Sequence, residues 1–134
     1  MKIRATVLCL PVTDLQKTLD FYKGVFGFSD AQIDGDMLAL ELPSLSLFLI
    51  TKESYESYTK KANRRALMPG VSAPAVMSCA VETKEDVDQA LGRTAVHGGT
   101  SAGPAAIDTT SGGYTGYVTD PDGHLWELVC PHQK

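Results

Sequence analysis

The sequence predicts an α+β fold in which two βαβββ modules pair into a half-open barrel. Two observations lead to this prediction. A strand, an amphipathic helix and three further strands are expected in residues 1–51, and the same order returns in residues 75–134. The segment 52–74 between them contains Pro69-Gly70, a dipeptide typical of boundaries. A chain of 134 residues suits a single domain in which both modules share one core.

The first module opens with a strand over residues 3–12, which are rich in β-branched and apolar side chains. Thr13 or Asp14 offers the N-cap of the following helix, whose apolar residues recur at helical spacing. Gly24 and Gly27 are expected to end that helix. Three strands are then predicted at residues 28–34, 37–43 and 45–51.

The second module repeats this pattern, with a strand over residues 75–83. Thr83 and Asp86 form a plausible capping pair for its helix, and Gly98-Gly99 ends it. A type I turn fits Asp120-Pro121-Asp122-Gly123, which has Pro at the second position and Gly at the fourth. The three remaining strands are predicted near residues 100–108, 114–120 and 124–130.

The pairing of two such modules predicts a central cavity. The helix of each βαβββ module covers one face of its sheet and leaves the other face apolar. If the two sheets lie side by side and curl, the uncovered faces enclose a half-open space lined by strand residues from both modules. A ligand is expected there.

Composition and charge argue against several classes of function. The net charge is −4 and there is no basic stripe, so no nucleic-acid partner is expected. No apolar run approaches the roughly 20 residues of a membrane span, so no membrane partner is expected either. Cys9, Cys79 and Cys130 are odd in number and far apart, which supports neither a zinc ribbon nor a disulfide framework. We expect reduced thiols in a cytoplasmic protein.

Three segments resemble the vicinal oxygen chelate superfamily, which includes glyoxalase I, the fosfomycin and bleomycin resistance proteins and ring-cleaving dioxygenases. They are LPVTDLQKTLDFYKGVFGF, EDVDQAL with its following Gly-Gly, and GGYTGYVTDPDGHLWELV. The resemblance implies a glyoxalase-like fold of paired βαβββ modules. In metal-using members it further implies a divalent ion at the centre, held by residues on the first and last strand of each module.

Only one of these four ligand positions carries a donor in this chain. Glu127 stands on the last strand of the second module, but the first-strand positions fall on Val7 and Val76, and residues 45–51 contain no carboxylate, imidazole or amide. A site for Zn, Ni, Mn or Fe needs about three nitrogen or oxygen side-chain ligands around an open position. The sequence therefore predicts no metal cofactor. The alternative is one divalent ion with Glu127 among its ligands.

Glu127 is the candidate for a catalytic or binding role in the cavity. Burial is expected to raise the pKa of its carboxyl, as suits a general acid or base or the anchor of a ligand. The structural alternative is an acid paired with a backbone amide or with a cation at the rim. His124, three residues earlier on the strand, is expected to face the opposite side, and Trp126 to face the helices as core. The remaining residues expected to line the ligand cavity are Val7, Cys9, Val76, Ser78, Tyr114 and Tyr117.

The function predicted from these observations is metal-independent binding of a small organic ligand, with Glu127 as its polar anchor. The alternative is an enzyme, either a glyoxalase-type lyase or isomerase or a dioxygenase, that uses a divalent metal. A third class is a structural or partner-binding module. A homodimer is a further expectation, suggested by the resemblance.

Overall fold

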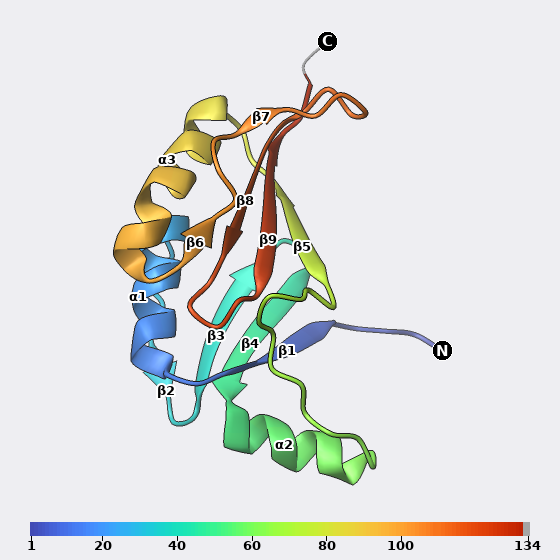
Figure 1. Ribbon diagram of the computed structural model, residues 1–134. Coiled ribbons are helices and arrows are strands. Elements are labelled where there is room, and N and C mark those ends of the chain that lie inside the picture. The colour runs from blue at the N-terminus through green and yellow to red at the C-terminus, as the bar shows by residue number, and fades with distance from the viewer. Residues whose placement is uncertain (133–134) are drawn as a thin grey trace.

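The computed structural model describes residues 1–132, so the last two residues of the predicted second module lie outside the described part. Two sheets lie one above the other, with helices α1 and α3 together on one side (Figure 1). The first unit comprises β1 (Val7–Val12), α1 (Leu15–Phe26), β2 (Ile33–Asp34), β3 (Met37–Leu42) and β4 (Leu45–Thr51). The second comprises β5 (Val76–Ala80), α3 (Lys84–Thr94), the 3-10 turn η1 (Ala95–His97), β6 (Thr100–Ser101), β7 (Ala106–Ile107), β8 (Tyr114–Thr119) and β9 (Leu125–Cys130).

The strand order confirms the predicted fold class. The first sheet runs β1-β4-β3-β2, and the second runs β5-β9-β8-β6, with β7 also paired to β8. In each unit the first strand pairs in parallel with the last. The two sheets remain separate, because β1 and β5 are edge strands that do not hydrogen-bond to each other within the described residues. The assembly is therefore open along these edges.

The segment between the units and the strand predicted near residues 100–108 add detail to the fold. Helix α2 (Lys52–Lys61) occupies the start of the segment and packs on β1 and β4. In place of one continuous strand near residues 100–108 there are the short strands β6 and β7. Both strands pair with β8, and between them Gly103, with a φ of 115°, and Pro104, which has no N–H, interrupt this pairing. No helix in the described part of the chain is long and apolar enough to cross a membrane.

The helices α1 and α3 begin at the predicted caps, but only one of the predicted ends is correct. Gly24 lies inside α1, and α3 ends at Thr94, after which η1 continues to its cap at Gly98. Asp14 caps α1 by accepting a hydrogen bond from the backbone N–H of Lys17 at 3.1 Å, and Gly27 ends it in the left-handed conformation. Thr83 and Asp86 form the complete capping box of α3. These caps fix where each helix leaves its first strand.

The core joins the two units through their helix side. Trp126 on β9 is 1% exposed and packs against Phe26 of α1, with ring centroids 4.7 Å apart. Tyr22 of α1 lies edge-on to the same indole. Because α1 belongs to the first unit and β9 to the second, the aromatic contacts bury surface from both units in one cluster.

A buried hydrogen-bond network fixes the start of β9. The Tyr22 hydroxyl donates to Asp120 Oδ2 at 2.8 Å and accepts from Trp126 Nε1 at 3.0 Å. Asp120 also accepts from the backbone N–H of His124, whose ring Nε2 lies 2.7 Å from the carbonyl oxygen of Pro11. The predicted turn at residues 120–123 therefore also connects β9 to the first unit.

Candidate functional site

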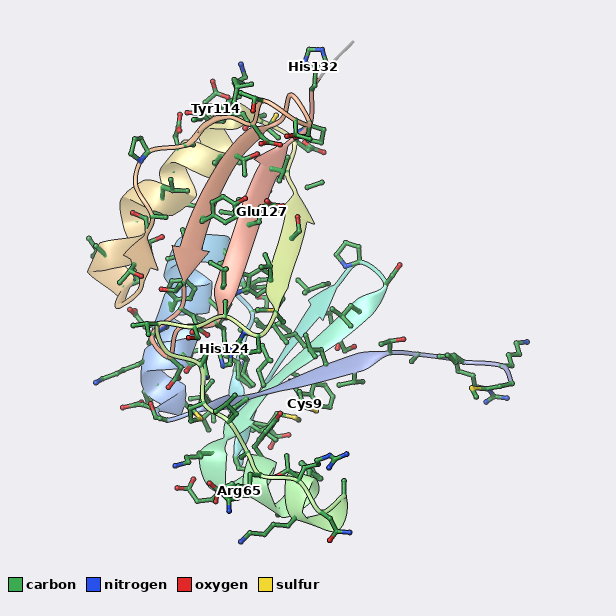
Figure 2. All side chains as sticks on the ribbon, turned by 45° about the vertical axis from the view of Figure 1, so that its right-hand side comes forward. Cys9, Arg65, Tyr114, His124, Glu127 and His132 are labelled. Carbon is green, nitrogen blue, oxygen red and sulfur yellow. The ribbon has the colours of Figure 1, made fainter. Side chains whose placement is uncertain are left out.

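The candidate site is a row of three polar side chains across the second sheet. In the strand register Ser78 of β5 lies opposite Glu127 of β9, which lies opposite Tyr117 of β8. Side chains alternate along a strand, and Trp126 and Leu128 are buried, so Glu127 is on the outer face, away from α3 (Figure 2). Ser78 Oγ donates to Glu127 Oε1 at 2.7 Å, and Tyr117 OH donates to Oε2 at 2.6 Å.

These hydrogen bonds decide the electrostatics of Glu127. The Tyr117 hydroxyl, and then the Ser78 hydroxyl, hold the pKa of the carboxyl below its usual value. The expectation that burial raises this pKa is wrong, because the open sheet face desolvates the carboxylate too little to outweigh two donors. The same contact raises the pKa of Tyr117, which stays a neutral donor. Glu127 is thus a weaker base than an ordinary glutamate, which favours a role as a charged anchor over general acid–base chemistry.

Apolar groups surround this polar row. Val76 is 52% exposed and lies on the same face, as do Leu125 and Val129. A groove of about 510 Å³ runs along the free edge of β5, between the two sheets, and Ser78 belongs to its wall. The other lining residues are Leu8, Leu42, Pro43, Leu45, Val76, Met77, Cys79, Ala80 and Trp126. The carboxylate therefore sits one strand away from an apolar groove of ligand size.

The first sheet carries an apolar counterpart of the polar row. There the register aligns Cys9 of β1, Phe48 of β4 and Ala39 of β3. Phe48 thus occupies in the first unit the place that Glu127 occupies in the second. Val7 is 45% exposed near this row, and Figure 2 shows Cys9 on the first sheet, well away from Glu127. The sequence did not single out Phe48. The one signal that could have found it is that residues 45–51 contain no carboxylate, imidazole or amide to bind a metal.

The structure brings together some of the predicted cavity residues and separates others. Glu127, Ser78 and Tyr117 are in contact, and Val76 shares their face. Val7 and Cys9 lie on the other sheet.

Tyr114 lies apart from the polar row. It is on the helix side of β8, where its hydroxyl donates to Asp88 of α3 at 2.6 Å. Lys84 Nζ lies 5.6 Å from its ring centroid. Figure 2 places Tyr114 at the end of the sheet near His132. Its contacts therefore tie β8 to α3.

Trp126 and His124 both lie as the alternation along β9 predicts. Trp126 is core, and His124 is 7% exposed on the face opposite Glu127. Neither side chain reaches the polar row.

The donors present do not fit a divalent metal centre. Val7, Val76 and Phe48 have no lone pair to offer, and each carboxylate oxygen of Glu127 already accepts a hydroxyl. Within residues 1–132 no three His, Cys, Asp or Glu side chains gather as a metal site would require. We therefore derive no reaction step through a metal.

Two βαβββ units, each with its first strand paired in parallel with its last, define the class of fold. The chain belongs to the Glyoxalase/Bleomycin resistance protein/Dioxygenase superfamily, whose family model matches residues 4–128. No match was found among curated proteins.

Solved structures agree with the fold. A glyoxalase-related enzyme from Fulvimarina pelagi is 23% identical, with a TM-score of 0.80 over 95% of this chain and 87% of that chain. The hypothetical protein SA1046 from S. aureus is 22% identical, with a TM-score of 0.76, 97% of this chain and 94% of that chain being covered. The fosfomycin resistance protein FosX from Listeria monocytogenes is 18% identical, with a TM-score of 0.62 over 100% and 94% of the two chains. At these identities the likeness concerns the fold.

Proposed function

We propose that this chain is a metal-independent small-molecule-binding protein of the superfamily, with a compact organic ligand on the open faces of the sheets and Glu127 as its polar anchor. One observation supports this above others. A carboxylate held by two hydroxyls lies one strand away from an apolar groove of about 510 Å³, and Ser78, one of its donors, belongs to the groove wall. Valine and phenylalanine occupy the other positions where the resemblance implies metal ligands. Pockets of this size with a few fixed polar groups suit small ligands.

Metal content tests the proposal against its enzymatic alternative. Tag-free protein is incubated with Ni, Zn, Mn or Fe(II), desalted and analysed by elemental mass spectrometry. We expect less than about a tenth of an equivalent of each metal, because one carboxylate without further donors binds a divalent ion weakly. About one equivalent, lost in Glu127→Gln, would instead support a metal-dependent lyase, isomerase or dioxygenase.

Ligand binding is tested separately by thermal unfolding against a library of small organic compounds. A ligand that binds only the folded state raises the melting temperature. We expect at least one compound to do so with wild-type protein and to lose its effect in Glu127→Gln. A library without any such compound would argue for the third class, a structural or partner-binding module.

We also propose that the chain forms a homodimer through the outer faces of its sheets. Val7 and Val76 are exposed on these faces and Phe48 is half-buried, because α1 and α3 cover the opposite side. In a two-fold dimer the Phe48 face of each copy can lie over the Glu127 face of the other and enclose a ligand. Light scattering then gives twice the chain mass of 14.4 kDa, and Phe48→Glu lowers it. A single-chain mass at high protein concentration would refute the dimer.

The remaining proposals concern compartment and partners. The three cysteines are unpaired, which fits a reducing compartment, and we propose the cytoplasm. We propose a small organic molecule as the partner, and neither a nucleic acid nor a membrane.

A further inference from the structure

We infer that the ligand anchored by Glu127 is an organic cation, an ammonium or amidinium group carried on a compact apolar body. This inference rests on the proposed function and narrows it to one chemical class. Three features of the described residues carry it: the charge left on Glu127, the kind of hydrogen bond that its surroundings offer, and the apolar surface beside it.

Among residues 1–132 the negative charge of Glu127 has no cationic partner. Within residues 1–132 the ion pairs are Lys52 with Glu56 and His97 with Asp20, both far from β9 in sequence and on other elements. None of the described outer-face residues of β5, β8 and β9 is cationic. These residues are Val76, Ser78, Ala80, Thr115, Tyr117, Thr119, Leu125, Glu127 and Val129. The two hydroxyls orient the carboxylate but leave its full charge in place.

The polar row offers acceptors to a ligand. Ser78 and Tyr117 have both spent their hydroxyl hydrogens on Glu127, so the ligand meets the remaining lone pairs of the two carboxylate oxygens. A ligand group must therefore donate. A positively charged donor binds a carboxylate more strongly than a neutral one does, and a carboxylate or phosphate ligand is repelled.

The surroundings suit a cation with an apolar body. Val76, Leu125 and Val129 lie on the same face as the carboxylate and offer apolar surface to the body of a ligand. The Tyr117 ring, 38% exposed on the same face, offers its π surface to a cation. The groove beyond Ser78 provides about 510 Å³ for the apolar body. The net charge of −4 adds a long-range attraction for cations.

A glutamate on the first sheet supplies a matched control. Glu41 of β3 also accepts a serine hydroxyl, from Ser46 at 2.7 Å, and is exposed. It lacks a second hydroxyl donor, and the groove does not include it. Glu41→Gln therefore changes the net charge by the same amount as Glu127→Gln and alters no residue of the polar row or of the groove wall.

The experiment measures dissociation constants by protein NMR for ligands that differ only in charge. The probes are 2-phenylethylammonium, 2-phenylethanol and 3-phenylpropionate, with cyclohexyl and butyl analogues of each, in buffer with a chelator. We expect the ammonium to bind about ten-fold more tightly than the alcohol, with shifts at the amides of β5, β8 and β9. Glu127→Gln should remove this preference and leave alcohol binding within about two-fold, whereas Glu41→Gln should preserve it.

The outcomes separate the inference from the proposed function. Binding of alcohols or carboxylates on the outer face of the second sheet, equal to or tighter than that of the ammonium ions, overturns the inference and leaves the proposed function standing. An ammonium preference that survives in Glu127→Gln also overturns the inference. If no probe of any charge shifts these amides up to its solubility limit, both the inference and small-molecule binding at this site fail. The amide spectra of both variants, outside the substituted strand, report whether the fold is intact.

Discussion

Replacing Tyr22 with Phe tests whether the buried network holds β9, and with it Glu127, against the first unit. The substitution keeps the ring in the aromatic cluster and removes one hydroxyl. That hydroxyl donates to Asp120 at 2.8 Å and accepts from Trp126 at 3.0 Å. The partners are 2% and 1% exposed, so water cannot easily replace the lost contacts.

The size of the effect follows from the two unsatisfied groups. Leaving a buried donor or acceptor without a partner costs about 1–3 kcal/mol. Asp120 Oδ2 loses its Tyr22 donor, but Oδ1 keeps the backbone donors Asp122 and His124, so the carboxyl stays partly satisfied and its loss is taken toward the lower end of that range. Together we expect Tyr22→Phe to reduce the free energy of unfolding by about 2–4 kcal/mol, a fall in melting temperature of roughly 6–20 °C.

Urea unfolding followed by circular dichroism measures this loss. The m-value should match wild type, since the surface exposed on unfolding hardly changes. Tyr58→Phe is the matched control, because Tyr58 is 57% exposed on α2, and we expect it to change stability by less than about 0.5 kcal/mol. A loss in Tyr22→Phe as small as that of the control would show that the network contributes nothing to holding the units together.

Two further predictions concern ionisable groups. Tyr117→Phe removes the donor that most lowers the pKa of Glu127, so a carbon-detected NMR titration should find this pKa higher than in wild type; an unchanged value would contradict the assigned hydrogen bond. Burial raises the pKa of Asp120, with opposition from the nearby His124 and the Tyr22 hydroxyl, so the folded state binds this proton more tightly than the unfolded state. The stability that Asp120 contributes relative to Asp120→Asn should therefore fall as pH rises from about 4 through the folded pKa. Urea unfolding of both proteins across this range measures the difference, and a difference that stays constant or rises with pH would contradict the raised pKa.

Local patterns were sufficient to predict most elements. Alternation along residues 125–130 correctly placed Trp126 in the core and Glu127 on the opposite face. Thr83 and Asp86 predicted the start of α3, because a capping box is complete within four residues. The strand near residues 100–108 was less well predicted, since Gly103 and Pro104 divide it into β6 and β7.

The partners of Glu127 depend on two registers of different range. The short turn at residues 120–123 sets the β8–β9 pairing, so the contact with Tyr117 could have been found by counting back from that turn. The contact with Ser78 joins residues 49 apart through a parallel pairing, and nothing local determines that register. This is why the sequence predicted a buried acid of raised pKa, whereas the structure has one held ionised by two hydroxyls.

The two hydroxyls also explain how a lone acid can remain on a largely apolar face. A metal ion would neutralise a carboxylate at this position. Its other expected ligand positions, however, hold Val7, Val76 and Phe48, which have only hydrocarbon side chains. Ser78 and Tyr117 instead satisfy the oxygens of Glu127 without neutralising them. Their geometry lowers the cost of partial desolvation and keeps the charge available. A site that retains an uncompensated charge beside an apolar groove gains most from a ligand that brings the opposite charge, and this physical asymmetry distinguishes the Glu127 face from the Phe48 face of the same fold.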